Sequence, residues 1–269
     1  MTPRRASVSQ YEAFKQSLGL SRSVLVHGLS YKDNCTPLKA FVADLGTDRT
    51  TGVAVISRTT TDAEISNLHA AGVRGVRLDL YSQGAMHDLD KQVEILKFYS
   101  SRIAPWNWSL GFLQLNASNW DKLAPLIPTL PVDVVVDHHA LLKAKSRLPG
   151  DLEVAKQPGL KAIVRLLKGQ NFWIKLSAPY RCSDAAPYYE DMEEIVRTLV
   201  KVNPRRVVWG SDWPHTPKMA VRSKEEALKE IPFLQIDDDA WLMSLRRWLT
   251  DDEWQLLMVD NPRRLFGLR

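Results

Sequence analysis

Cysteine is scarce in this chain, and other features that would narrow its class are missing. Only Cys35 and Cys182 occur among 269 residues. Two cysteines cannot supply the disulfide framework of small secreted proteins, so a reduced compartment is the simpler interpretation. The first residues, MTPRRASVSQ, contain no apolar stretch of the signal-peptide kind, and no apolar run is long enough to cross a bilayer. We therefore predict a cytoplasmic protein without a membrane partner.

Charge of one sign is not concentrated either. The chain has 36 Lys and Arg against 31 Asp and Glu, a net charge of +5. The surplus is spread along the chain, and its nearest approach to clustering is a set of Arg-Arg pairs: Arg4-Arg5, Arg205-Arg206, Arg246-Arg247 and Arg263-Arg264. Because no basic stripe is interleaved with aromatic residues, nucleic acid is not a predicted partner. The mild positive field favours a small anionic substrate.

No Gly/Ser-rich linker or low-complexity stretch divides the chain, which predicts a single domain over residues 1–269. Short β-branched runs alternate with helical patterns along its length. Strands are predicted over residues 23–27, 52–57, 73–80, 108–115, 132–137, 172–176 and 206–209. Helices are predicted over 9–20, 34–45, 62–71, 88–103, 119–127, 159–167, 187–202 and 240–268. This alternation predicts an α/β fold with a parallel sheet, either a closed barrel or a doubly wound open sheet. Seven strands are found, whereas the common closed barrel has eight.

Ionisable side chains recur where the predicted strands end. His27 follows the first strand, Arg77 lies within the third, and Asp137-His138-His139 ends the fifth. The segment 177–181, SAPYR, follows the sixth strand, and 210–215, GSDWPH, follows the last. Parallel α/β folds bind ligands beyond the carboxyl ends of their strands. We therefore expect these groups to meet at a common rim.

Asp212 is the strongest single candidate for a catalytic group. A carboxylate directly after a buried strand can act as a general base or a metal ligand, with capping of the next helix an equally weighted alternative. His138 can polarise a carbonyl or bind a metal, although a histidine at a strand end is more often structural. His215 lies close enough to share this site or to hold its loop. His139 should point the opposite way in an extended segment and is interpreted as structural.

Two arginines are suited to binding substrate carboxylates. The paired donors of Arg77 and Arg181 match a carboxylate, and the alternative for each is an ion pair within the protein. That alternative is about equally weighted for Arg77 and less favoured for Arg181. His27, Tyr180 and His215 complete the predicted substrate-binding set.

Five segments taken together resemble the amidohydrolase superfamily. They are VRGVRLDL (73–80), VVVDHHA (134–140), WIKLSAPYR (173–181), VVWGSDWPH (207–215) and DNPRRLFG (260–267). The resemblance runs from about Tyr11 to Gly267, includes the pair Asp33-Asn34, and is greatest to the "amidohydrolase 2" branch, which contains 2-pyrone-4,6-dicarboxylate lactonase. It implies a distorted (β/α)8 TIM barrel that opens a lactone by adding water, without strict dependence on a metal.

The resemblance also implies roles for individual residues. Asp212 matches the general base of the family, and His138 matches the histidine that helps to polarise the scissile carbonyl. Arg77 and Arg181 match residues that bind substrate carboxylates. These roles agree with those inferred from the residues alone.

The chain departs from the family pattern in three places. It contains no His-x-His motif, which in the family ends the first strand, and nothing before Ser9 resembles a buried strand. A basic position expected after Arg77 falls near Gln83, and an expected tyrosine falls at Gln114, which argues against the dicarboxylate itself as substrate. Two usual metal ligands are missing, so no metal ligands and no cofactor are predicted, with a weakly bound zinc ion left open.

The missing first strand has two explanations, a shortened amino terminus or a natural loss. Either would expose two sheet edges unless residues 1–9, another segment or another subunit covers them. A homo-oligomer is therefore left open. The preferred function is a hydrolase of a lactone or a similar cyclic carboxylated compound. The alternatives are a related decarboxylase and a non-catalytic binding protein.

Overall fold

The protein is built on a curved sheet of seven parallel strands. The computed structural model describes residues 2–217, 225 and 229–268. The strands pair in the order of the sequence, β2 to β8. Their bounds are β2 Ser23–Val26, β3 Thr50–Ala54, β4 Val73–Arg77, β5 Ser109–Phe112, β6 Val134–Val136, β7 Phe172–Ser177 and β8 Val207–Gly210. The prediction of a TIM-barrel-like α/β fold with seven strands is confirmed.

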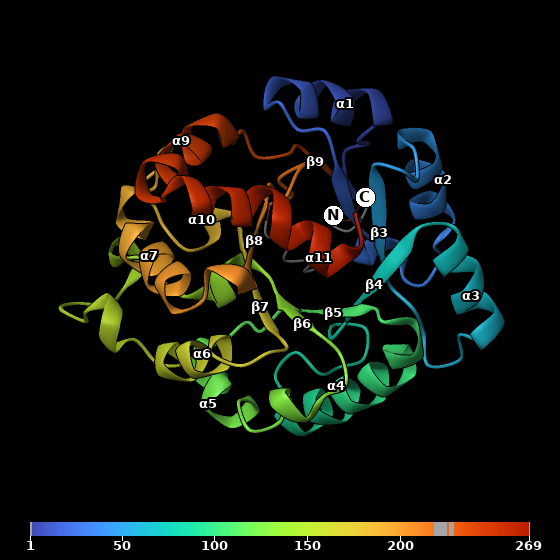
Figure 1. Ribbon diagram of the computed structural model, residues 1–269, viewed down its shortest axis with the longest axis horizontal. Coiled ribbons are helices and arrows are strands. Elements are labelled where there is room, and N and C mark those ends of the chain that lie inside the picture. The colour runs from blue at the N-terminus through green and yellow to red at the C-terminus, as the bar shows by residue number, and fades with distance from the viewer. Residues whose placement is uncertain (1, 218–224, 226–228, 269) are drawn as a thin grey trace.

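Helices surround this sheet (Figure 1). Their bounds are α1 Val8–Ser17, α2 Thr36–Leu45, α3 Asp62–Ala70, α4 Leu89–Ile103, α5 Trp120–Leu123, α6 Leu160–Leu167, α7 Glu193–Val202, α9 Asp238–Trp248, α10 Asp251–Gln255 and α11 Asn261–Phe266. The main core lies between the outer face of the strands and the inner faces of the helices. None of the described helices is long and apolar enough to cross a membrane.

Most predicted strands are shorter in the structure, because each apolar run continues into the loop at its carboxyl end. The strand predicted over 73–80 stops at Arg77, and the one predicted over 132–137 covers only Val134–Val136. The helix predicted over 119–127 is reduced to Trp120–Leu123 between two 3-10 turns. The loops at the carboxyl ends of the strands carry most of the polar rim residues. Because the strands are shorter than predicted, most of the candidate residues lie in these loops and not on the strands.

The two edge strands, β2 and β8, are not paired with each other in the described part of the chain. Helix α1 lies between α9 and α2 in the outer ring (Figure 1). It contacts α2, and Tyr11 and Phe14 pack against Trp213 with ring centroids 5.0 and 5.9 Å away. A short parallel pair, β1 Thr2–Pro3 with β9 Glu230–Ile231, lies apart from the main sheet. The amino-terminal segment therefore links the regions that follow the two edge strands.

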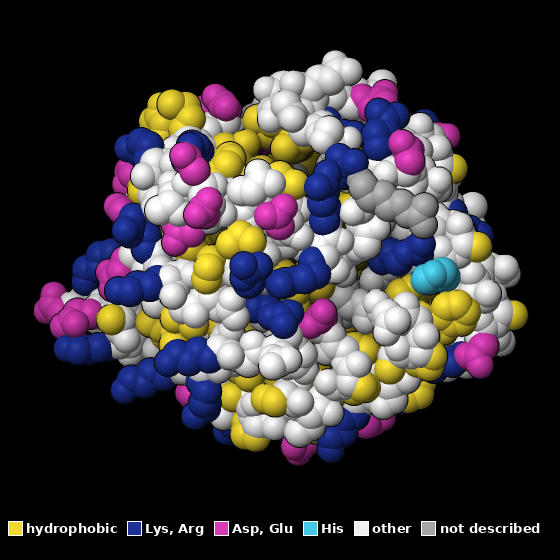
Figure 2. All heavy atoms as spheres, in the orientation of Figure 1, with side chains coloured by type: hydrophobic (Ala, Val, Ile, Leu, Met, Phe, Trp, Pro, Cys, Tyr) yellow, Lys and Arg dark blue, Asp and Glu magenta, His cyan; other side chains and the backbone are white. Residues whose placement is uncertain are grey.

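The carboxyl-terminal helix α11 packs on the interior of the sheet. Leu265 and Phe266 form a second apolar cluster with residues of β3, β6, β7 and β8: Val53, Val135, Trp173 and Val208. Arg206 and Arg264 both lie over the Trp173 ring, 4.7 and 4.8 Å from its centroid. Lys and Arg side chains gather near the middle of this face (Figure 2). Two of the Arg-Arg pairs that are distant in sequence thus meet here, at the amino ends of the strands.

Candidate active site

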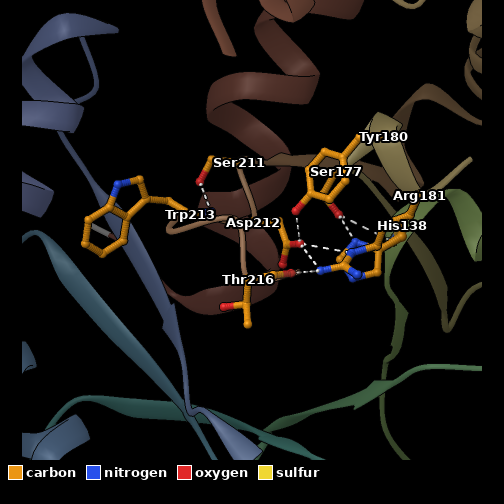
Figure 3. Close-up of polar contacts among 8 residues, drawn as sticks. All are labelled: His138, Ser177, Tyr180, Arg181, Ser211, Asp212, Trp213 and Thr216. Carbon is orange, nitrogen blue, oxygen red and sulfur yellow. Dashed lines mark hydrogen bonds and ion pairs between the residues drawn. The ribbon is translucent and has the colours of Figure 1, made fainter. Parts of the chain in front are cut away.

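Asp212 lies in direct contact with two of the predicted substrate-binding residues. Its Oδ2 atom accepts hydrogen bonds from the Tyr180 hydroxyl at 2.7 Å and from Arg181 Nε and Nη2 at 3.1 and 2.9 Å (Figure 3). Arg181 also donates from Nη2 to the carbonyl oxygen of Thr216, at 3.1 Å. The side chains of Arg181 and Asp212 are about a quarter exposed, at 25% and 27%. The loops after β7 and β8 therefore meet through a partly desolvated ion pair.

The surroundings of this ion pair fix the charge of its members. Burial lowers the pKa of Arg181, but the carboxylate of Asp212 more than offsets this, so the pKa is raised and the guanidinium is charged. Burial, together with the negative charge of Asp212, raises the pKa of the Tyr180 hydroxyl, which stays protonated as a donor. Both donors are therefore permanent at neutral pH.

His138 is placed beside this group by a hydrogen bond from β7. Its Nδ1 atom lies 2.9 Å from Ser177 Oγ, and its backbone N–H donates to the same oxygen. Burial lowers the pKa of His138, and the opposing effects of Asp137 and Asp212 are smaller. The ring is therefore neutral near pH 7. A neutral ring with Nδ1 tied to Ser177 keeps Nε2 for a ligand.

Asp137 and Lys175 form a buried ion pair in the barrel interior that the sequence analysis missed. Lys175 Nζ lies 2.6 Å from Asp137 Oδ1, and their side chains are 18% and 10% exposed. Burial raises the pKa of Asp137, but the charges of Lys175 and Arg77 and the hydrogen bond from Lys175 lower it well below its usual range. A Cβ atom on Gly210 would lie 2.9 Å from Lys175 Cδ, so glycine leaves room for the lysine side chain. Because Lys175 keeps Asp137 deprotonated, the carboxylate of Asp137 places a negative charge next to His138 in the chain.

A signal for Lys175 was present in the sequence. Side chains alternate across a strand, so Trp173, Lys175 and Ser177 share the face of β7 that points into the barrel. A lysine on an interior face must have a partner, because an unpaired charge there is strongly unfavourable. Its partner Asp137 is one of the residues at the strand ends.

Arg77 and His27 form a second group at the ends of β4 and β2. Arg77 Nη1 donates to the carbonyl oxygen of His27 at 3.1 Å. The His27 ring is buried and accepts a hydrogen bond at Nδ1 from the backbone N–H of Val55, at 3.2 Å. Burial and the charge of Arg77 lower the pKa of His27, so its ring is neutral. Here Arg77 orders the rim through the backbone of β2.

His215 and Trp213 make their main contacts with elements other than the Asp212 carboxylate, although the His215 ring also lies edge-on to Tyr180, with ring centroids 6.0 Å apart. His215 Nε2 lies 2.7 Å from Asp238 Oδ2, and both side chains are almost fully buried. The Trp213 ring points to the opposite side of the loop from Asp212 and packs on α1 (Figure 3). Both residues thus anchor the loop that carries Asp212, which matches the loop-holding alternative for His215.

The backbone after β6 differs from the expected extended form. His138 and His139 have φ values of 53° and 55°, in the left-handed region. His139 is fully buried, and its ring lies edge-on to Trp241 of α9. We expected His139 to point away from the rim because side chains alternate along a strand. In the structure it lies in a turn, and the turn is what directs its ring toward Trp241. Asp212, with φ of 65°, shares this uncommon conformation, which is frequent where folds hold functional groups in place.

The donor set at the rim does not suit a tightly held metal ion. The described residues contain no group of three or more His, Cys, Asp and Glu side chains placed to hold one. One of the two Asp212 oxygens, Oδ2, already accepts hydrogen bonds from a guanidinium and a hydroxyl. Gln114, at the position expected to be tyrosine, is buried and donates to Gln92 Oε1 at 2.7 Å. Gln83 donates to the carbonyl oxygen of Asp79.

Comparison with known proteins agrees with this fold. A sequence model of the family described as "Amidohydrolase" matches residues 1–268. A 2-pyrone-4,6-dicarboxylate hydrolase from Comamonas testosteroni is 31% identical, over 98% of this chain and 82% of that protein. A 4-sulfomuconolactone hydrolase from Hydrogenophaga intermedia is 27% identical, over 99% of this chain and 81% of that protein.

A solved structure from Acinetobacter baumannii has a similar fold. It is described as a "probable 2-pyrone-4,6-dicarboxylic acid hydrolase" with citric acid bound. It is 25% identical with a TM-score of 0.69, over 99% of this chain and 92% of that chain. The fold and the rim define a barrel of the amidohydrolase type, with its polar groups at the carboxyl ends of the strands. The chain belongs to the amidohydrolase family.

Proposed function

We propose that this protein is a hydrolase that opens a lactone ring carrying a carboxylate. The observation that carries the proposal is the placement of Asp212, which lies against Arg181 and Tyr180 and within range of His138. A base, a neutral imidazole and a carboxylate-binding arginine are the groups that such a reaction needs at one place. The named activities of the two relatives, each a hydrolase of a cyclic or lactone substrate, support the same reaction class.

In the proposed reaction Asp212 takes a proton from water, and the water oxygen attacks the lactone carbonyl. His138 Nε2–H donates a hydrogen bond to the developing oxyanion, and Arg181 and Arg77 orient the carboxylated ring. The bond between the carbonyl carbon and the ring oxygen then breaks, and the leaving oxygen receives the proton held by Asp212. Balance requires only the lactone and one water, and no step passes through a metal.

The test is hydrolysis of a panel of carboxylated lactones by the wild type and by Asp212→Asn. We expect the substitution to reduce kcat by about 100-fold or more, the usual contribution of a positioned base. Full activity of the variant on a substrate that the wild type hydrolyses would remove Asp212 from the mechanism. Metal analysis of the purified protein, and assays with and without a chelator, separate this route from a metal-dependent one.

The same panel decides between the lactonase and its alternatives. Carbon dioxide release without ring opening would point to a decarboxylase, and ligand binding without turnover would point to a binding protein. We also propose a cytoplasmic location, which is supported by the free, buried thiols of Cys35 and Cys182.

A further inference from the structure

The group proposed as the general base is held by three hydrogen bonds in the structure. All three reach the same oxygen, Oδ2 of Asp212, and two of them come from the Arg181 guanidinium. Hydrogen bonds to a carboxylate stabilise its charged form, and those from a charged donor do so most strongly. With three donors around it, Oδ2 has no free direction from which a water molecule could donate a proton. The resting arrangement therefore opposes the reaction that the same residues serve.

The hydrogen-bonding capacity of Arg181 explains how this arrangement can be released. A guanidinium grips a carboxylate with two parallel donors along one edge. Asp212 takes the edge formed by Nε and Nη2. Arg181 Nη2 also donates to the Thr216 carbonyl oxygen. Of the three guanidinium nitrogens, Nη1 takes part in none of these hydrogen bonds. Arg181 can therefore not grip a substrate carboxylate along the Nε–Nη2 edge while it holds Asp212.

We propose that Arg181 is a clamp on Asp212 that the carboxylate of the substrate opens. The incoming carboxylate takes the Nε–Nη2 edge of Arg181, and Asp212 Oδ2 is left with the single hydrogen bond from Tyr180. The base becomes effective only when a carboxylated ring is in place. This inference rests on the proposed function and adds a condition to it: selectivity for carboxylated lactones is exerted on kcat as well as on binding.

Neighbouring charges favour this exchange over simple loss of the ion pair. The rim holds three cations from two strands, namely Arg77 at the end of β4, Lys175 on β7 and Arg181 in the loop after β7. The carboxylate of Asp137 is committed to Lys175 at 2.6 Å. Of these three cations, Arg77 is the one held by a backbone carbonyl and not by a carboxylate. A substrate carboxylate therefore enters a region with one more cation than carboxylates among these residues, where it can replace Asp212 as the partner of Arg181. Citric acid, a tricarboxylic acid, is the bound molecule in the solved relative from Acinetobacter baumannii.

The decisive experiment uses a carboxylated lactone that the wild type hydrolyses and the neutral methyl ester of the same compound. For Arg181→Met we expect a crossover. The kcat/KM for the carboxylated lactone falls, because its anchor is lost, whereas kcat for the neutral ester rises about tenfold, the value of one released charge-assisted hydrogen bond. Arg181→Lys keeps the charge but not the paired donors and should lie between the two.

Arg77→Met is the matched control, because Arg77 donates to the His27 carbonyl and not to Asp212. It should lower kcat/KM for the carboxylated lactone without raising kcat for the ester. If Arg181→Met also fails to raise kcat for the ester, the clamp does not exist, even though the lactonase activity stands.

A second measurement is independent of turnover. In protein labelled with carboxyl-¹³C aspartate, the signal of Asp212 is identified by its loss in Asp212→Asn. Citrate should shift this signal in the wild type and leave it in place in Arg181→Met. A wild-type signal that citrate leaves unchanged, whether or not citrate binds elsewhere, overturns the clamp. A citrate-dependent shift in a protein that opens no lactone would retain the clamp and reject the proposed reaction.

Discussion

At the scale of residues, Asp212, Arg181 and Tyr180 form one hydrogen-bonded group that joins the loops after β7 and β8. Position after a strand was enough to single out Asp212, Arg181 and Tyr180, because the carboxyl ends of parallel strands meet at one edge. Which of them touch could not be read from spacing. The contacts depend on loop conformations such as the left-handed backbone at Asp212. Aspartate adopts this conformation more often than most residues, but its presence in a sequence does not by itself predict it.

The buried residue His139 leads to a prediction about the pH dependence of stability. Burial and the charge of His138 lower the pKa of His139 to about 3. Between this value and about 6.5, the usual pKa of histidine, the unfolded chain is protonated at His139 and the folded chain is not. The unfolded state thus binds the extra proton. The free energy of unfolding should therefore fall as the pH drops from about 6.5 toward 3.

His139→Phe removes this proton-binding site and can keep the edge-on ring contact with Trp241. We expect urea denaturation at a series of pH values to give the variant a shallower loss of stability below about pH 6.5 than the wild type. His87→Phe, at an exposed position, is the control and should leave the slope unchanged. Parallel curves for wild type and His139→Phe would show that His139 is not the group responsible.

At the scale of elements, the number of strands and their places along the chain followed from periodicity, because a β-branched run that is apolar throughout is typical of a strand buried on both faces. Periodicity left the order of the strands in the sheet open, and the family resemblance implied the barrel. Periodicity did not predict how helix α1 contacts the loop after β8 and so connects the two edges of the sheet, β2 and β8. Tyr11 and Phe14 repeat at helical spacing and predicted only an amphipathic helix. Their partner Trp213 is some 200 residues away, and no local pattern identifies a contact at such a separation.

Helix α1 should therefore stabilise the loop that carries Asp212. For Tyr11→Ala we expect a loss of about 1–2 kcal/mol in the free energy of unfolding, because the ring is partly buried and packs at a tilt against Trp213. Tyr81→Ala, at a tyrosine that is 78% exposed, should change stability by less than about 0.5 kcal/mol. Equal effects of the two substitutions in urea denaturation would mean that the contact of α1 with Trp213 does not stabilise the protein.

At the scale of the whole molecule, seven strands make a barrel whose interior needs filling from outside the sheet. Interior side chains of a closed eight-stranded barrel pack against one another in layers. Here Leu265 and Phe266 of α11 join Val53, Trp173 and Val208 from separate strands. The sequence predicted a helical tail over 240–268, but not that its end enters the barrel. That outcome depends on a space that exists only after the strands have assembled.

If α11 completes the core of the barrel, its loss should weaken the whole fold and not the tail alone. Phe266 is 5% exposed, so Phe266→Ala removes a full aromatic contact and leaves a cavity, at a cost of about 3 kcal/mol. The unfolding transition should remain single and shift as a unit, whether followed by far-UV circular dichroism or by tryptophan fluorescence. Met243→Ala, at a residue that is 51% exposed on α9, provides the comparison and should shift it little. A Phe266→Ala transition that splits in two, or that matches Met243→Ala, would mean that α11 covers a barrel already stable without it.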